Sequence, residues 1–287
     1  MSETVAVIGP GRMGLALGGA LMQAREVERL VYFGRSAEPP PHPLFEGEGV
    51  GYTMGYGPLP EETAILILAV PDDAIHDVAN QVARMGKAPS PCVALHLSGA
   101  LSTDVLAPLH GAGFMVGSLH PLQTVADPWS GVDRLRGCAY ALAGEPGALS
   151  VARRIVAALD GQPLVIPPAL RPLYHATAVF ASNYVLVAAA AVARTLAEAG
   201  IAEEEAVAAA LPLMRGTMDN LEQLGLGAAL TGPVARGDVD TVRLHLSRLS
   251  PRERRLYSAL GMETVQLARA VGLDPDRAAA LESLLQD

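Results

Sequence analysis

From residue 4 to about residue 168, short apolar runs alternate with segments of helical periodicity. Several apolar runs are continuous, which is typical of strands buried on both faces of a parallel sheet. The segments between them, such as 72–85 and 147–159, have the pattern of crossover helices. This order predicts an α/β fold with a doubly wound, mostly parallel sheet. The predicted strands are Val5–Ile8, Leu30–Phe33, Ala64–Val70, Val93–Leu97, Met115–Leu119, Ala139–Ala143 and Leu164–Ile166.

The pattern changes twice along the chain. Residues 37–60 are rich in proline and glycine, which predicts a loop. After Pro167 and Pro168 the sequence turns to long Ala- and Leu-rich periods, which predict an all-helical second domain. We therefore expect a dinucleotide-binding domain over residues 1–168 and a helical substrate and dimerisation domain over 169–287. The predicted helices are 172–199, 202–224, 238–246, 251–271 and 274–285.

A glycine motif follows the first predicted strand directly. In the G-x-G-x-x-G pattern, Gly9 suits a tight turn, Gly11 lets a pyrophosphate approach the backbone, and Gly14 allows close packing of helix on strand. Arg12 and Met13 lie between the glycines, at the start of an amphipathic helix whose N-terminus would face the phosphates. Because the motif lies between a strand and a helix, it predicts a Rossmann dinucleotide-binding domain.

The residues at the end of the second strand determine whether a Rossmann domain prefers NAD or NADP. NAD-binding chains carry a carboxylate there for the ribose hydroxyls, whereas this chain has Arg35 and Ser36, which suit a 2′-phosphate. NADP is therefore expected in preference to NAD, although Arg35 could also be an ordinary surface charge. Val70 and Pro71, at the end of the predicted strand that begins at Ala64, are expected beside the same cofactor.

Composition limits the function. The chain has 21 basic and 30 acidic residues, a net charge of −9, and lacks a basic run, so nucleic acid is not expected as a partner. Cys92 and Cys138 are too few for a disulfide framework or a zinc site, and the histidines show no helical metal-binding spacing, so no metal is expected. The first residues show no cationic leader, which predicts a cytoplasmic protein.

One apolar stretch, residues 176–193, approaches the length of a membrane span. Ser182 and Asn183 lie in its middle and Arg194 closes it, and lipid would leave these polar groups without partners. We therefore expect no membrane contact, but a helix buried in a soluble bundle or in the interface of a homodimer.

Polar residues follow two of the predicted strands. Ser98 ends one strand, and His120 and Gln123 follow the next. In open α/β sheets, ligands bind at the carboxyl ends of the strands. We expect Ser98 and His120 to take part in catalysis and Gln123 to contact a substrate.

A second polar group lies on the long apolar helix. His175 is in its first turn, Ser182 lies seven residues further on the same face, and Asn183 is adjacent. Such groups cost stability unless they are bonded or used. They could bond to neighbouring helices or across a dimer interface. Alternatively, His175 donates a proton while Asn183 orients the substrate and Ser182 contacts it.

A mechanism that uses a lysine of the helical domain as the acid is excluded, because the single lysine, Lys87, lies in the predicted nucleotide domain. A proton for a reduced carbonyl or imine must then come from a histidine, Tyr174, a hydroxyl or water. Arg236, in a Gly/Pro turn, could clamp a substrate carboxylate. Alternatively, the turn only starts a helix with Asp238 as N-cap.

These segments together resemble the family of Rossmann-like oxidoreductases with a C-terminal domain of unknown function, over nearly the whole chain. Besides the phosphate loop, the segments are 97–99, 120–123, His175 with 182–184, and 231–238. The family is similar in architecture to pyrroline-5-carboxylate reductase, ketopantoate reductase and 6-phosphogluconate dehydrogenase, whose helical domains often dimerise. The resemblance implies an NADP-linked reductase.

The chain departs from these relatives in two ways. It lacks the helix lysine of the ketopantoate reductases and hydroxyacid dehydrogenases, and it lacks the Ser/Thr- and Gly-rich substrate loop of the proline-forming reductases. We expect an NADP-dependent oxidoreductase that reduces a small carbonyl or imine acid in the cleft between its domains, with ketopantoate as one candidate. The alternative is a non-catalytic NADP-binding sensor or interaction protein.

Overall fold

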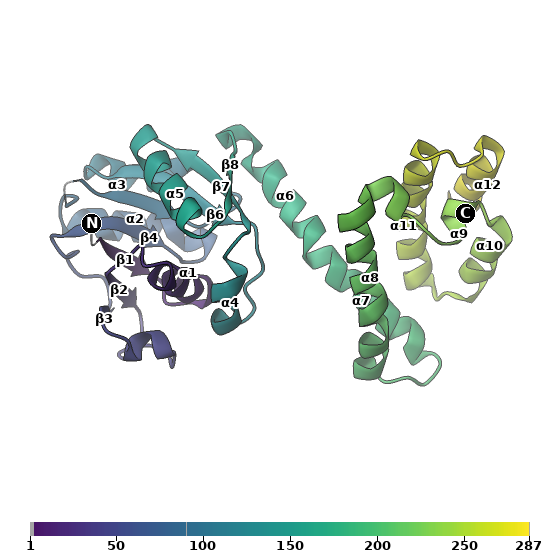
Figure 1. Ribbon diagram of the computed structural model, residues 1–287, viewed down its shortest axis with the longest axis horizontal. Coiled ribbons are helices and arrows are strands. Elements are labelled where there is room, and N and C mark those ends of the chain that lie inside the picture. Colours follow the sequence, from purple (N-terminus) through teal and green to yellow (C-terminus); the bar gives the residue numbers. More distant parts are fainter. Residues whose placement is uncertain (1–2, 90, 287) are drawn as a thin grey trace. The chain divides into compact units, whose positions relative to one another are not determined.

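An eight-stranded sheet forms the centre of the N-terminal half of the computed structural model, which describes residues 3–89 and 91–286 (Figure 1). The strand order is β3-β2-β1-β4-β5-β6-β7-β8, and neighbouring strands are parallel except β6 and β7. The predicted doubly wound, mostly parallel sheet is confirmed. The strands are β1 (Thr4–Ile8), β2 (Arg29–Gly34), β3 (Val50–Met54), β4 (Thr63–Leu68), β5 (Val93–His96), β6 (Met115–Pro121), β7 (Ala139–Gly144) and β8 (Gln162–Val165).

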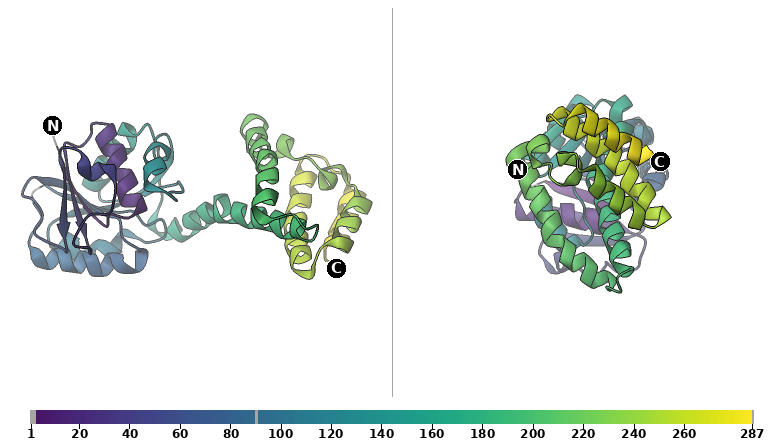
Figure 2. Two further views of the ribbon diagram at one scale, coloured as in Figure 1. Left: turned by 90° about the horizontal axis from the view of Figure 1, so that it is seen from below. Right: turned by 90° about the vertical axis from the view of Figure 1, so that its right-hand side faces the viewer.

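Helices cover both faces of this sheet (Figure 2). Val5 and Val7 of β1 face one core, under α1 (Arg12–Gln23), α4 (Pro128–Arg134) and α5 (Pro146–Ala158). Ala6 and Ile8 face the other core, under α2 (Ile75–Met85), α3 (Ala107–Gly111) and the short 3₁₀ helix η3 (Thr103–Leu106). Because successive side chains of a strand point to opposite faces and both faces are covered, the strands are continuous apolar runs.

The loop predicted over residues 37–60 is wrong in part. It contains the 3₁₀ helix η1 (Pro43–Glu46) and strand β3, which pairs parallel with β2. β3 is an edge strand whose residues are exposed or half-buried, and its second residue is Gly51. An edge strand with little apolar surface to bury has no continuous apolar run, so the glycine and proline signals dominate the pattern.

The C-terminal half is helical, as predicted. Its elements are η4 (Pro168–Leu170), α6 (Arg171–Ala181), α7 (Asn183–Ala197), α8 (Glu203–Ala229), α9 (Pro233–Arg236), α10 (Val239–Arg248), α11 (Pro251–Ala270) and α12 (Pro275–Gln286). The single helix predicted over 172–199 is wrong, because Ser182 adopts a non-helical conformation (φ −122°, ψ −71°) and separates α6 from α7. Val242, Val265 and Leu281 lie at the centre of a small core formed by the last helices.

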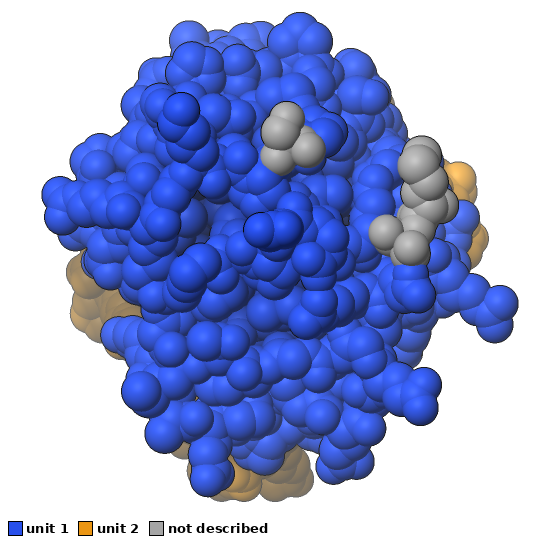
Figure 3. Space-filling model, turned by 90° about the vertical axis from the view of Figure 1, so that its left-hand side faces the viewer, with its two compact units in different colours: residues 1–182 blue, residues 183–287 orange. Residues whose placement is uncertain are grey.

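The chain divides into two compact units, Met1–Ser182 and Asn183–Asp287 (Figure 3). Helix α6 belongs to the first unit, because Arg171 at its start is fully buried and binds groups that follow β5 and lie on β6. The domain boundary predicted after residue 168 lies one helix before this division. Met1 and Ser2, used in predicting the absence of a leader, and Asp287, the predicted end of the second domain, lie outside the described residues.

Within the described residues, one helical segment, Pro168–Ala197, is long and apolar enough to cross a membrane by length and composition. Only 6% of its apolar 18-residue stretch is buried. The burial expected for residues 176–193 is therefore not provided within either compact unit. The dimer interface named as the alternative stays a prediction.

Candidate functional site

The loop between β1 and α1 places its three glycines in different environments. Gly9 has a φ of +101°, and a Cβ there would overlap the carbonyl oxygen of Ala69. A Cβ on Gly14 would overlap the carbonyl oxygen of Gly9. A Cβ on Gly11 would meet no atom within 4 Å. Gly9 and Gly14 are thus required by close packing within the chain, whereas Gly11 leaves its backbone open to a ligand.

Arg12 and Met13 form the start of α1 behind this loop. Arg12 is exposed, and Met13 is half-buried against the core under α1. The first turn of α1 contains no acidic residue. Its unpaired N–H groups and the positive end of the helix dipole are therefore available to an anion.

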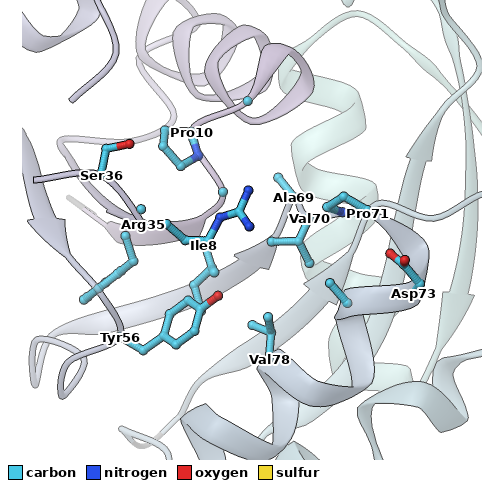
Figure 4. Close-up of a pocket in the computed structure, with 15 residues that line it drawn as sticks. Ile8, Pro10, Arg35, Ser36, Tyr56, Ala69, Val70, Pro71, Asp73 and Val78 are labelled. Carbon is cyan, nitrogen blue, oxygen red and sulfur yellow. The ribbon is translucent and has the colours of Figure 1, made fainter. Parts of the chain in front are cut away.

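A pocket of about 580 Å³ opens beside this loop at the carboxyl end of the sheet (Figure 4). Six of the residues predicted to bind the cofactor line it: Gly9, Gly11, Arg35, Ser36, Val70 and Pro71. They come from the ends of β1, β2 and β4, which lie side by side in the sheet. The remaining lining residues are Ile8, Pro10, Phe33, Gly34, Tyr56, Ala69, Asp73, Ala74 and Val78.

The guanidinium of Arg35 lies inside this pocket (Figure 4). Across the described part of the chain, Arg35 has no ion pair and no side-chain hydrogen bond. A cation in a concave site without an internal partner is suited to an anionic ligand group. Tyr56, which also lines the pocket, is not among the residues predicted from the sequence, because it stands between Gly55 and Gly57 in the segment predicted as a loop.

A second polar cluster lies where β5 and β6 meet the start of α6. A Cβ on Gly99, just after β5, would lie 2.6 Å from Nδ1 of His175 and 2.8 Å from Nε2 of His120. The structure therefore brings together two of the predicted catalytic histidines, which are 55 positions apart in the sequence. Nδ1 of His175 is buried and has no hydrogen-bond partner among the residues that the structure describes.

Ser98 is buried in this cluster and organises the turn after β5. Its hydroxyl donates a hydrogen bond to Asp72 (2.7 Å) and accepts bonds from the N–H groups of Ala100 (3.2 Å) and Leu101 (3.1 Å). Its own N–H donates to Nδ1 of His96 (3.2 Å). The hydroxyl proposed from the sequence for catalysis is thus already engaged in holding the turn.

Arg171 supplies a buried positive charge beneath the cluster. Its guanidinium donates to the hydroxyl of Ser118 (2.9 Å) and to the carbonyl oxygen of Ser98, and its Nε has no partner within the described residues. Arg171 is not among the residues predicted from the sequence, because an arginine at a helix start usually points into solvent.

The titration of the histidines follows from burial and from these neighbours. Burial first, then the charges of His175 and Arg171, lower the pKa of His120 from 6.5 to about 4. Burial first, then Arg171 and His120, lower the pKa of His96 to about 3. Burial raises the pKa of Tyr174 to about 12. Near neutral pH both imidazoles are therefore neutral and the phenol keeps its proton.

These pKa shifts predict acid sensitivity of the first unit. Between about pH 6.5 and pH 4 an unfolded histidine binds a proton that folded His120 does not, so the free energy of unfolding falls as the pH falls. Below the pKa of folded His120, this residue binds a proton in both states and no longer makes the free energy of unfolding depend on pH. The free energy of unfolding can be measured at several pH values in this range by urea unfolding, followed by the fluorescence of Trp129. Its slope against pH should be smaller in His120→Gln than in wild type, by up to about 1.4 kcal/mol per pH unit. Equal pH dependence in both proteins would show that His120 is not held neutral.

The other predicted substrate residues have local partners or lie elsewhere. Gln123 is exposed, and its side chain bonds to the carbonyl oxygen of Arg134 (3.3 Å) and the N–H of Thr124 (2.9 Å). Ser182 ends α6, in the first unit, while Asn183 starts α7, in the second unit.

Arg236, in the second unit, forms an exposed ion pair with Asp238 at 2.9 Å. Asp238 occupies the N-cap position of α10, but its carboxylate makes no capping bond. The predicted helix start with Asp238 at the N-cap position is therefore confirmed, while its carboxylate binds the guanidinium of Arg236 and not a backbone N–H group.

The sequence matches two known families. Residues 58–121 match a Rossmann-like domain, and residues 138–264 match DUF2520, a domain of unknown function. The chain combines a Rossmann-like domain with a DUF2520 domain. The DUF2520 match begins at β7 and includes α6 with His175, so it extends over parts of both compact units. No curated protein matches the sequence.

Solved structures similar to this DUF2520-containing chain share its fold over nearly its whole length. A protein from Thermotoga maritima is 24% identical with a TM-score of 0.70, covering 93% of this chain and 98% of that one. A proposed NADP oxidoreductase from Bacteroides fragilis is 19% identical with a TM-score of 0.70, covering 94% and 98%. A Plasmodium falciparum pyrroline carboxylate reductase, solved with NADP bound, is 15% identical with a TM-score of 0.59, covering 98% of both chains.

Proposed function

We propose that this protein is an NADP-dependent oxidoreductase that reduces a small carbonyl or imine acid. The observation that carries the proposal is the pocket that joins the open backbone at Gly11 to the unpaired guanidinium of Arg35. Two of the structural relatives support it, since one is described as a proposed NADP oxidoreductase and another is a reductase solved with NADP.

The residues of the pocket fit a dinucleotide with a 2′-phosphate. Gly11 and the start of α1 would hold the pyrophosphate, because their backbone is open and the helix dipole favours an anion. Arg35 and Ser36 would hold the 2′-phosphate by charge-assisted hydrogen bonds. Val70 and Pro71 would pack against the cofactor beside this loop. A nicotinamide cofactor supplies a hydride to the substrate when it is bound.

The histidine cluster supplies the polar groups that such a reduction requires. His175 is the proposed proton donor, and the neighbouring His120 would bond to the reacting group. The buried charge of Arg171 favours a substrate that carries a carboxylate, since no carboxylate within the described residues bonds to this guanidinium. Gln123, Ser182, Asn183 and Arg236 are proposed as further substrate contacts. Ketopantoate is a candidate substrate.

The first test is a fluorescence titration of wild type and Arg35→Ala with NADPH and with NADH. We expect wild type to prefer NADPH, and Arg35→Ala to bind NADPH about 10–100-fold more weakly with little change for NADH, because charged hydrogen bonds contribute about 1.5–3 kcal/mol. Arg84→Ala is the matched control, since Arg84 is exposed on α2 and does not line the pocket. Equal affinity of wild type for both nucleotides, or no binding, would contradict the proposal.

We propose in addition that the protein is a homodimer formed through the apolar surface of α7 and α8. Leu186, Leu213 and Leu226 on these two packed helices are 70%, 76% and 66% exposed, and large apolar side chains exposed in this number are typical of an interaction site. Light scattering at micromolar concentration should give a dimer for wild type and a monomer for Leu213→Glu. Leu244→Glu, on α10, is the control that should stay dimeric. A wild-type monomer would contradict the proposal, and release from cell membranes only by detergent would assign this surface to lipid.

A further inference from the structure

His120 and Tyr174 form a hydrogen-bonded pair that joins β6 to α6. The phenol oxygen of Tyr174 lies 2.9 Å from Nδ1 of His120, and the two rings meet edge to face at 88° with centroids 5.6 Å apart. Tyr174 is buried. His120 is half-buried, so the protein groups around the pair bear on the direction of the hydrogen bond.

The phenol must be the donor in this bond. A neutral imidazole carries one N–H, so Nδ1 either accepts from the phenol or donates to it. If Nδ1 donated, the phenol proton would need another acceptor, and the described residues offer none to Tyr174. Leaving a buried hydroxyl proton unbonded costs about 1–3 kcal/mol. The phenol therefore donates to Nδ1, and the proton of His120 lies on Nε2.

The protonated nitrogen is the one that faces the rest of the cluster. A Cβ on Gly99 would lie 2.8 Å from Nε2 of His120 and 2.6 Å from Nδ1 of His175. Within the described residues, neither of these nitrogens has a hydrogen-bond partner. Nε2–H of His120 is thus a donor held in a fixed direction beside the proposed proton donor.

We infer that Tyr174 is a positioning residue that holds His120 as its neutral Nε2–H tautomer, so that His120 offers the substrate a hydrogen-bond donor. The substrate group at this nitrogen then has to be an acceptor, such as a carbonyl or carboxylate oxygen, and not an N–H or O–H group. This last step rests on the proposed function. The tautomer itself does not depend on it.

The test is a long-range ¹H–¹⁵N spectrum of the histidine rings at about pH 7.5, where the protonated and unprotonated nitrogens resonate far apart. The signals of His120 are assigned from their loss in His120→Gln. We expect an unprotonated Nδ1 and a protonated Nε2 in wild type. In Tyr174→Phe, which keeps the ring and removes the hydroxyl, both nitrogens should move to averaged positions because the two tautomers exchange.

The chain provides a matched control. Tyr257 makes the same contact with Nδ1 of His245, at 2.9 Å and 85°, in the second unit. Tyr257→Phe should leave the His120 signals unchanged. A protonated Nδ1 in wild-type His120, or wild-type positions retained in Tyr174→Phe, would overturn the inference. Wild-type protein that binds neither NADPH nor NADH but shows the expected tautomer would refute the proposed function and leave this inference supported.

Discussion

Gly9→Ala is expected to lower the free energy of unfolding of the first unit by about 2–4 kcal/mol and to abolish measurable NADPH binding. The backbone of Gly9 has a φ of +101°, which is strained for a residue with a side chain, and the new Cβ would overlap the carbonyl oxygen of Ala69. The turn must open to relieve this overlap. Since the same turn presents the start of α1, the phosphate site is lost together with the packing.

Gly11→Ala separates these two effects. A Cβ at Gly11 meets nothing within 4 Å, and its backbone conformation (φ −84°, ψ −176°) is open to alanine. Stability should therefore stay within about 0.5 kcal/mol of wild type, while NADPH binding weakens because the methyl group occupies the approach to the backbone. Urea unfolding and the nucleotide titration measure the two quantities on each variant. Equal stability of Gly9→Ala and wild type would refute the packing argument, and unchanged NADPH affinity of Gly11→Ala would remove the pyrophosphate from this loop.

The difference between Gly9 and Gly11 is one that the sequence predicts, because the spacing of the motif directly after a strand encodes it. The sheet was predictable for a similar reason. Strands such as β1 and β4 are buried on both faces, so their continuous apolar runs are visible without knowledge of their neighbours. β3, at the exposed edge, carries no such signal.

The arrangement of the second polar cluster could not be predicted in the same way. His120 and Tyr174 are 54 positions apart, and no local pattern tells which hydroxyl will meet an imidazole. From the sequence alone, Arg171 looks like a surface charge. It is buried only because the helix that it begins packs against β6. Arg236, the predicted substrate clamp, forms an exposed ion pair with Asp238 only two residues away, and its role in substrate binding stays a prediction. Contacts between distant segments decide which polar residues remain free.

Gly99→Ala is expected to reduce turnover at least about 100-fold and to lower the free energy of unfolding by about 1–3 kcal/mol, while NADPH affinity stays nearly unchanged. Its Cβ would lie 2.6 Å from Nδ1 of His175 and 2.8 Å from Nε2 of His120, closer than a methyl group can approach either ring. Both imidazoles must turn away, and a displacement of about 1 Å at a reacting centre costs about 10²-fold. The cofactor pocket is not lined by Gly99, so its affinity for NADPH should be retained.

Gly111→Ala is the matched control, because Gly111 lies at the end of α3 and its Cβ would meet no atom within 4 Å. Steady-state oxidation of NADPH with a panel of keto and imino acids, compared with the nucleotide titration, separates turnover from binding. Turnover by Gly99→Ala at the wild-type rate would show that the two histidines do not act on the substrate. Loss of NADPH binding together with turnover would mean that the cluster supports the cofactor rather than the proton transfer.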